Sequence, residues 1–231
     1  MGKIVILTGA GISAESGLGT FRDEGGLWAQ HRIEDVATPE GFARDPALVH
    51  WFYNARRAQA ATASPNAAHD ALARLEAGYP GEVVIVTQNV DDLHRRAGSR
   101  RVLHMHGTLD GALCAGCGHR WPAPSEMTPD TPCPACKAPA ARPDVVWFGE
   151  FPYHMDEIAD HLSGATHFAA IGTSGQVYPA ASFVEEARMA GAECDELSLE
   201  QTALSHVFDR QISGPATRSV PAWVAELLDR A

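Results

Sequence analysis

The sequence predicts an α/β fold in which a parallel sheet carries a small insert held together by a metal ion. Three short apolar runs occupy residues 3–8, 82–87 and 166–171, and each ends in a small or polar loop. Runs of this kind are typical of buried parallel strands. Residues 111–144 break the pattern, because they are rich in Cys, Pro and Gly and show little apolar periodicity.

The loops that follow the three strands are expected to meet in one ligand site. They are Gly9-Ala10-Gly11, Gln88-Asn89 and Gly172-Thr173-Ser174. In doubly wound parallel sheets, ligands bind outside the carboxyl ends of the strands, where such loops lie.

Helical signals lie between the strands. Asp45-Pro46 and Ser64-Pro65 each combine an N-cap residue with a proline suited to the first helical position. Apolar residues follow the second signal at a helical period, and Gly78 is expected to end that helix. A further helix is expected over residues 183–190, and a short terminal helix around Trp223.

Length and charge restrict the class of protein. The chain has 231 residues, of which 45% are hydrophobic, so it can bury the core of one large domain, with or without a smaller insert. The formal net charge is −11, and nucleic-acid binders usually carry a basic patch, so we expect no nucleic-acid partner. No apolar run approaches the ~20 residues that span a membrane, and the N-terminus lacks the features of a signal peptide. The expectation is a cytoplasmic protein with no membrane partner.

The cysteines predict a metal site. Cys114-x-x-Cys117 and Cys133-x-x-Cys136 are separated by fifteen residues, a pattern that suits a tetrahedral zinc ion with four thiolates. Such a site has no open position for water, so we expect one structural zinc without a catalytic role. Cys194 lies elsewhere and is expected to be a buried small apolar residue.

The glycine loop after the first strand has two explanations. Gly9-x-Gly11-x-x-Ala14 matches the dinucleotide-binding fingerprint in its Gly/Ala form, but glycine-rich turns also serve close packing. Ordinary dehydrogenases carry a ribose-binding acid at the end of the second strand, about 20 residues further on. Residues 25–29 contain no acid and follow no strand-like run, which argues against a dehydrogenase.

Two polar motifs are candidates for the chemistry. His104 and His106 would point to the same face of a strand, directly before the insert, where two subdomains would meet. In Gln88-Asn89-Val90-Asp91, either Asn89 or Asp91 caps a helix, or the amide and carboxylate groups face a carboxamide ligand. Both explanations of this second motif stay open.

Taken in order, these motifs resemble the signature of the sirtuin family. The ordered set spans nearly the whole chain and comprises Gly9-Ala10-Gly11-Ile12-Ser13-Ala14-Glu15-Ser16-Gly17, Thr20-Phe21-Arg22, Thr87-Gln88-Asn89-Val90-Asp91, His106-Gly107, the two Cys pairs, Phe148-Gly149-Glu150 and Gly172-Thr173-Ser174. The resemblance implies a Rossmann-like NAD-binding domain over residues 1–30, 76–110 and 145–231. It also implies a small domain made of a helical module (31–75) and a zinc-ribbon module (111–144), with acyl-lysine entering a tunnel between the domains.

The resemblance also assigns site residues. His106 would be the catalytic base that acts on a ribose hydroxyl. Contacts to NAD are implied for Gly9, Ala10, Gly11, Ala14, Glu15, Thr20, Phe21, Arg22, Gln88, Asn89, Val90, Asp91, Gly172, Thr173, Ser174, Ser198, Leu199, Glu200 and Ala216. Contacts to the substrate are implied for Tyr53, Arg56, Phe148, Gly149 and Val177. Three features depart from the family. Ser198 stands where Asn is usual and Gly19 where Pro is common, and the strand before Ser198 is unusually polar, with Glu193, Asp195 and Glu196.

The function that the resemblance implies is NAD-dependent removal of acyl groups from protein lysines. The acyl group would pass to ADP-ribose, with release of nicotinamide. Tyr53-x-x-Arg56 resembles the class III pattern, which is associated with acidic acyl groups, so we expect a desuccinylase as well as a deacetylase. Two alternatives are an NAD-dependent oxidoreductase and a non-catalytic zinc-containing module that recognises acylated or ADP-ribosylated proteins. Protein ADP-ribosylation is an open side reaction of the same chemistry.

Overall fold

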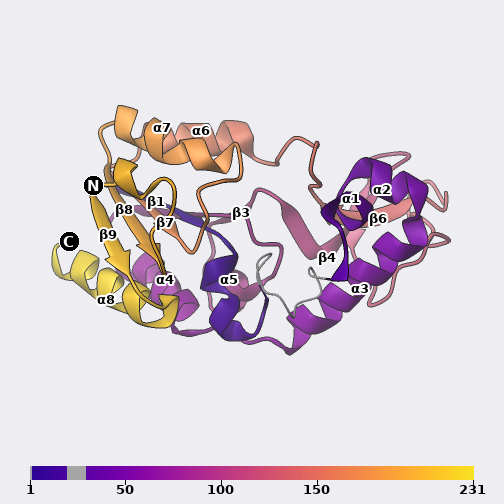
Figure 1. The fold of residues 1–231 in the computed structure, drawn as a ribbon, viewed down its shortest axis with the longest axis horizontal. Helices are drawn as coiled ribbons and strands as arrows, with labels where there is room; N and C mark the ends of the chain where they lie inside the picture. Colours follow the sequence, from indigo (N-terminus) through magenta and orange to yellow (C-terminus); the bar gives the residue numbers. More distant parts are fainter. Residues whose placement is uncertain (1, 20–29) are drawn as a thin grey trace.

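The computed structural model describes residues 2–19 and 30–231 and has a larger and a smaller part (Figure 1). In the described chain, the larger part contains a six-stranded parallel sheet. The spatial order of its strands is β3 (Val102–His104), β2 (Glu82–Thr87), β1 (Lys3–Thr8), β7 (His167–Ile171), β8 (Glu193–Ser198) and β9 (Arg210–Ser213). This is the order of a doubly wound dinucleotide-binding sheet, with its switch point between β1 and β7. The three predicted strands are therefore confirmed, the third beginning one residue later than expected.

Helices cover both faces of the sheet (Figure 1). The helices on one face are α4 (Ala67–Gly78) and α8 (Ala216–Asp229), and those on the other are α6 (Met155–Ser163) and α7 (Phe183–Met189). Successive residues of a strand point to opposite faces. Accordingly, Ile4 and Ile6 of β1 pack in the core with α4 and α8, whereas Val5 and Leu7 pack with α6 and α7.

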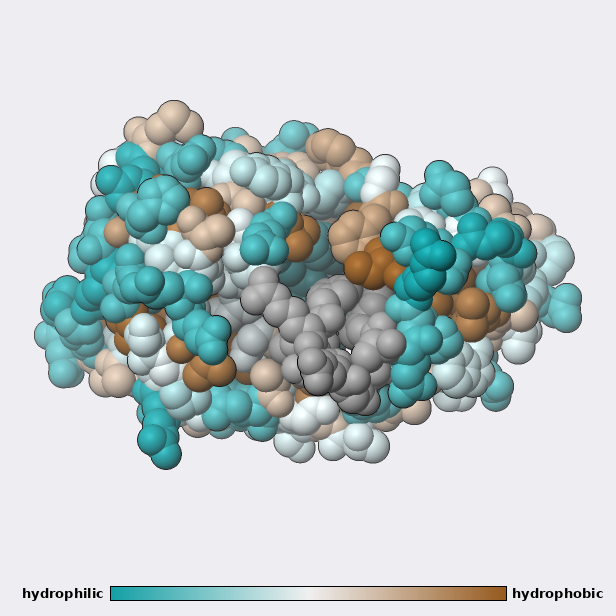
Figure 2. Space-filling view, in the orientation of Figure 1, coloured by the Kyte–Doolittle hydropathy of each residue, from teal (hydrophilic) through white to brown (hydrophobic). Residues whose placement is uncertain are grey.

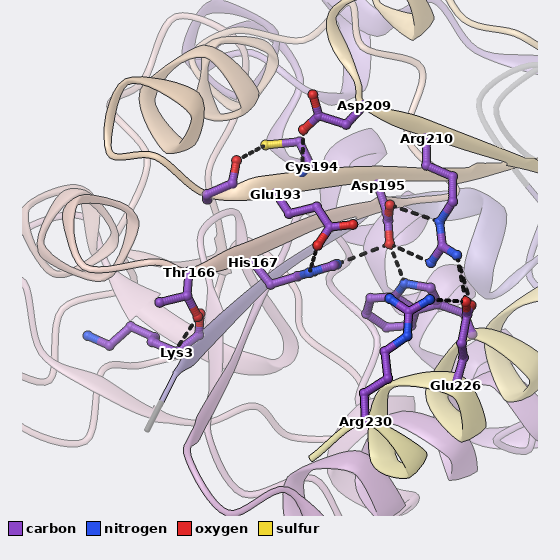
Figure 3. A network of polar contacts seen from close by, with 12 residues as sticks. Lys3, Thr166, His167, Glu193, Cys194, Asp195, Asp209, Arg210, Glu226 and Arg230 are labelled. Atoms are coloured by element: carbon purple, nitrogen blue, oxygen red, sulfur yellow. Dashed lines mark hydrogen bonds and ion pairs between the residues drawn. The ribbon is translucent and has the colours of Figure 1, made fainter.

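The unusually polar strand β8 is explained by a buried charge network (Figure 3). Asp195 has no exposed surface, and its carboxylate accepts hydrogen bonds from His167, Arg210 and the indole N–H of Trp223. Although burial raises the pKa of this carboxyl, these hydrogen bonds lower it well below its usual range. The network joins β7, β8, β9 and α8 through one ionised side chain.

The smaller part combines helices with an antiparallel sheet. The helices are α1 (Ile33–Val36), α2 (Pro39–Arg44) and α3 (Pro46–Thr62), and the strand order is β5 (Arg120–Pro122), β4 (Gly107–Cys114) and β6 (Ala141–Val145). The buried core cluster within the insert is small, with Ala112, Met127 and Ala141. The proposed bounds of the small domain are residues 31–75 and 111–144, although residues 67–75 belong to α4, which packs in the core of the larger part. Figure 2 shows hydrophobic residues gathered where the smaller part faces the larger one.

Two of the predicted helix boundaries need correction. Asp45 caps α3 as expected, because its carboxylate accepts from the backbone N–H of Leu48 at 2.9 Å. The cap of α4 is Asn66 and not Ser64, because Asn66 and His69 form a reciprocal capping box. The terminal helix α8 has 14 residues and is longer than predicted. Among the described residues, no helix combines the length and apolar character needed to cross a bilayer.

Candidate active site

The three loops that follow β1, β2 and β7 meet at the carboxyl edge of the sheet. The backbone N–H of Gly11 donates to the carbonyl oxygen of Gly172 at 2.9 Å. The side-chain amide of Asn89 donates to the carbonyl oxygen of Gly9 at 3.1 Å. The predicted convergence of these loops is confirmed.

The glycines make this convergence possible. A Cβ atom on Gly11 would lie 2.8 Å from the Cα and carbonyl oxygen of Gly172. Gly172 has a φ of 61°, and a Cβ atom there would lie 2.5 Å from the backbone nitrogen of Ile12. Backbone atoms cannot give way as side chains can, so these two loops require glycine for their mutual packing, whatever else they bind.

Asn89 and Asp91 are buried directly behind the glycine loop. The Asn89 amide also donates to the hydroxyl oxygen of Ser13 at 3.2 Å, and that hydroxyl donates to the Asp91 carboxylate at 3.1 Å. The second Asp91 oxygen accepts from the backbone N–H of Leu93 at 3.1 Å, at the start of α5 (Leu93–Arg96). Burial raises the pKa of Asp91. Its two oxygens offer about four acceptor positions, so it can satisfy α5 and still accept from a carboxamide.

His106 does not lie on a strand, which corrects the predicted geometry of the histidine pair. Strand β3 ends at His104, and His106 occupies the turn before β4. The rings nevertheless reach the same loop: Nδ1 of His104 lies 3.3 Å from the carbonyl oxygen of Asn89, and Nδ1 of His106 lies 3.0 Å from that of Gln88.

The two histidines differ in the exposure of their rings. A carbonyl can only accept, so the His106 Nδ1 carries the proton and its Nε2 is left as a base. Burial lowers the pKa of His106, and the ring remains half-buried. Burial lowers the pKa of His104 to about 4, and its Nε2 is buried with no partner among the described residues. His106 is therefore the better placed of the two to take a proton from a ligand.

A second layer of polar side chains supports the loop and was missed from the sequence. The ring of His69 accepts from the backbone N–H of Asn66 at 3.3 Å, and its Nε2 lies 3.5 Å from the hydroxyl of Ser13. The Nε2 of His94 lies 3.0 Å from the hydroxyl of Thr8. Apart from the capping contact, these partners are 56 and 86 positions apart, so no short motif indicates them.

Two further predicted cofactor positions, Glu15 and Ser198, make hydrogen bonds at this edge of the sheet. The Glu15 carboxylate accepts from the backbone N–H of Thr217 at 3.0 Å and from its hydroxyl at 2.7 Å, and the first of these hydrogen bonds contributes most to lowering the pKa of Glu15. Glu15 thereby links the glycine loop to the start of α8, where Ala216 lies. The hydroxyl of Ser198, at the end of β8, donates to the carbonyl of Glu200 at 2.5 Å.

The other members of this set are described by exposure. Leu199 is 71% exposed, and Ala10, Gln88, Thr173 and Ser174 are half-buried. Ala14 is exposed and Val90 is buried. The predicted contacts of Thr20, Phe21 and Arg22 lie outside the described residues.

The predicted acyl-binding residues lie on α3 and on two exposed loops. Tyr53 is buried, and the Arg56 guanidinium carbon lies 5.8 Å from the centroid of its ring, so the two share a helix face as predicted. Burial lowers the pKa of Arg56, and the neighbouring hydroxyl of Tyr53 and carboxylate of Asp91 oppose this. Phe148 and Val177 are 47% and 37% exposed, and Gly149 is also exposed.

The four paired cysteines form a candidate metal centre. Their sulfur atoms all lie within 4.8 Å of one another, with Cys114 to Cys136 at 3.6 Å and Cys117 to Cys133 at 3.7 Å. A regular tetrahedron of sulfurs about 2.3 Å from zinc has edges of about 3.8 Å, so the cluster fits this ion. Each Cys-x-x-Cys turn closes with the same backbone hydrogen bond, from Gly118 to Cys114 and from Lys137 to Cys133, both at 2.9 Å.

Comparisons with known proteins agree along almost the whole chain. A model of the Sir2 family matches residues 9–179. An NAD-dependent protein deacylase of Caulobacter vibrioides is 59% identical, over 99% of this chain and 98% of that protein. An NAD-dependent protein deacylase of Bdellovibrio bacteriovorus is 54% identical, over 98% of this chain and 97% of that protein. The solved complex of a Sir2 homologue with NAD is 38% identical, with a TM-score of 0.91, over 99% of this chain and 90% of that one.

Proposed function

The chain belongs to the Sir2 family, and we propose that it is an NAD-dependent protein-lysine deacylase with deacetylase and desuccinylase activity. The observation that carries this proposal is the position of His106 beside the buried Asn89–Asp91 loop, at the carboxyl edge of the sheet. The acyl group would pass to ADP-ribose as nicotinamide is released.

The donors at the site fit NAD. A buried carboxylate and an amide side chain suit the carboxamide and ribose of a nicotinamide nucleotide. Both protons of the Asn89 amide are engaged by Gly9 and Ser13, so its oxygen is the atom left to accept from a ribose hydroxyl. The glycine loop brings backbone close to the start of a helical turn, a suitable place for a pyrophosphate. When bound, NAD would supply the ribose carbon that takes the acyl oxygen.

The residues of the chain would transfer the proton and orient the cofactor and the substrate. We assign to His106 the removal of a proton from a ribose hydroxyl, through Nε2, with Gln88 holding the ring in the required tautomer. Asn89 and Asp91 would orient the nicotinamide end. The other predicted cofactor contacts, from Gly9 to Ala216, keep their proposed roles, and Phe148, Gly149 and Val177 would border the entry of the lysine chain.

Selectivity for acidic acyl groups is proposed for Tyr53 and Arg56. An acetyl group ends in a methyl, whereas a succinyl group ends in a carboxylate that is costly to bury unless it is paired. The Arg56 guanidinium can bind such a carboxylate through two parallel hydrogen bonds. The half-buried position of Arg56 one turn from Tyr53 supports this assignment.

The proposed partners are acylated lysine side chains of proteins. The net charge of −11 supports basic protein segments over nucleic acid. A cytoplasmic setting is proposed because four paired thiols bind zinc only where they stay reduced.

A panel of acetyl-, propionyl-, succinyl- and glutaryl-lysine peptides tests the function. Each is incubated with the protein and NAD, and nicotinamide and deacylated peptide are measured by chromatography. Release of nicotinamide in proportion to peptide is the expected result. Reduction of NAD, seen as absorbance of the reduced nicotinamide, would instead favour the oxidoreductase. Acyl-peptide binding without nicotinamide release would favour a non-catalytic module.

A further inference from the structure

A hydrogen bond between two aromatic side chains joins the helical module to the loop after β6. The indole nitrogen of Trp147 lies 3.0 Å from the hydroxyl oxygen of Tyr53. Tyr53 is 1% exposed and Trp147 is 3% exposed, so water does not compete for this contact. Both residues belong to the core cluster that also contains Val90, the residue between Asn89 and Asp91.

The chemistry of the two groups fixes the direction of this hydrogen bond. An indole N–H can only donate, so the Tyr53 oxygen accepts. A phenol carries one proton, and this proton is then directed away from the indole and left for another acceptor. Burial raises the pKa of Tyr53, so the hydroxyl keeps that proton near neutral pH.

Trp147 is itself held in one orientation. The guanidinium carbon of Arg142 lies 3.5 Å from the centroid of the indole ring. The Glu150 carboxylate accepts from both terminal nitrogens of Arg142, at 2.6 and 2.9 Å, and from the backbone N–H of Trp147 at 2.8 Å. The ring and its backbone are therefore fixed by the same ion pair, which leaves the indole N–H directed at Tyr53.

Packing alone does not account for a tryptophan at this position. A phenylalanine would fill much of the same aromatic cluster, which includes Phe42 with its ring 5.1 Å from that of Trp147. It would not donate to Tyr53. The indole N–H and the Arg56 side chain, which also hydrogen-bonds to Tyr53, thus determine where the Tyr53 proton points. Tyr53 stands one turn from Arg56.

We propose that Trp147 is a positioning residue for acyl-group selection, which turns the Tyr53 proton toward the terminal carboxylate of a succinyl- or malonyl-lysine held by Arg56. This inference rests on the proposed deacylase function. It assigns to the loop after β6 a part in substrate choice, in addition to the part of α3.

The test compares succinyl- and acetyl-lysine forms of one peptide. Trp147→Phe is expected to lower the succinyl-to-acetyl ratio of kcat/KM by about three- to tenfold, the range that one hydrogen bond accounts for, with the change in the KM of the succinyl peptide. In a Tyr53→Phe background, Trp147→Phe should change the ratio no further, because the residue acts through the hydroxyl.

Trp223→Phe is the matched control. Trp223 is also buried, and its indole N–H donates to Asp195 at 2.6 Å in the network of the larger part. This variant should lose stability without changing the ratio. An unchanged ratio in Trp147→Phe, an equal fall in Trp223→Phe, or additive effects with Tyr53→Phe would overturn the inference. Absence of deacylation by the wild type would overturn the proposed function as well.

A measurement on the wild type covers the case in which Trp147→Phe does not fold. The protein is labelled with ¹⁵N in its indole rings, and the Trp147 signal is the one that Tyr53→Phe displaces. Adding a succinyl-lysine peptide should shift this signal more than an acetyl-lysine peptide does. Equal shifts would show that the indole does not sense the acyl carboxylate.

Discussion

The imidazole rings of His69 and His94 pack edge to face behind the Asn89–Asp91 loop, with their centroids 4.9 Å apart. Both rings are buried, and burial lowers the pKa of each, to about 4 for His69 and well below the usual value for His94. Two positive charges at this separation would repel each other in a dry environment. The fold therefore depends on both histidines being neutral.

The buried, neutral histidines of this region predict a loss of stability in mild acid. An unfolded histidine has a pKa near 6.5. As the pH falls from 6.5 toward 4, the unfolded chain therefore binds protons that the folded chain does not bind, and this favours unfolding. His69 and His104, both with a pKa of about 4, should each cost on the order of 2 kcal/mol of unfolding free energy between about pH 7.5 and pH 5. The raised pKa of Asp91 has the opposite effect, because the folded chain binds this proton more readily than the unfolded chain does.

Urea unfolding at several pH values checks this prediction. His69→Gln removes the titrating ring but keeps an amide donor for Ser13, so its stability should depend less steeply on pH than that of the wild type. The same slope in both proteins would show that His69 does not titrate as its burial indicates.

Loss of the proposed base should reduce turnover without preventing cofactor binding. His106→Ala is expected to lower deacylation by at least ~100-fold, the lower range for removing a general base, while NAD binding by calorimetry persists. His104→Asn is the matched control, because an amide can still donate to the carbonyl of Asn89. It should lose much less activity, and near wild-type turnover in His106→Ala would remove that histidine from the mechanism.

The insert should depend on zinc for its structure. Metal analysis of protein purified without chelators is expected to show one zinc per chain, because the insert buries only a small core of its own. Cys114→Ser should lose the metal and make residues 111–144 sensitive to protease. Cys194→Ala, which changes the buried fifth cysteine in β8, should keep it. Protein that contains no zinc would contradict the assignment.

Arg56 should determine the preference for acidic acyl groups. The wild type is expected to remove succinyl groups at least as well as acetyl groups. Arg56→Met should weaken desuccinylation by roughly 2–5 kcal/mol, as expected when one partner of a buried charge pair is lost. Deacetylation should change far less, because a methyl group needs no charge partner. If kinetic assays show an equal fall in both activities, Arg56 is structural.

Local features of the sequence were enough to predict the strands β1 and β2, the cap of α3 and the metal cluster. Periodicity, caps and the spacing of Cys114 to Cys136 act over a few residues or within one short insert, so their effect can be inferred without knowing the fold. The motif order went further, because an ordered set of motifs specifies a family even where each motif is weak.

Contacts between distant segments were decided only by the tertiary structure. The sequence left open whether Gly9 and Gly11 serve packing or a cofactor, and the carbonyl of Gly172, more than 160 positions away, makes glycine necessary there. The polar strand β8 had no explanation until Arg210 and Trp223 were brought onto Asp195. The bond between Trp147 and Tyr53 spans 94 positions. No local pattern reports such pairs, because the energy of a buried hydrogen bond depends on which side chains the folded core brings together.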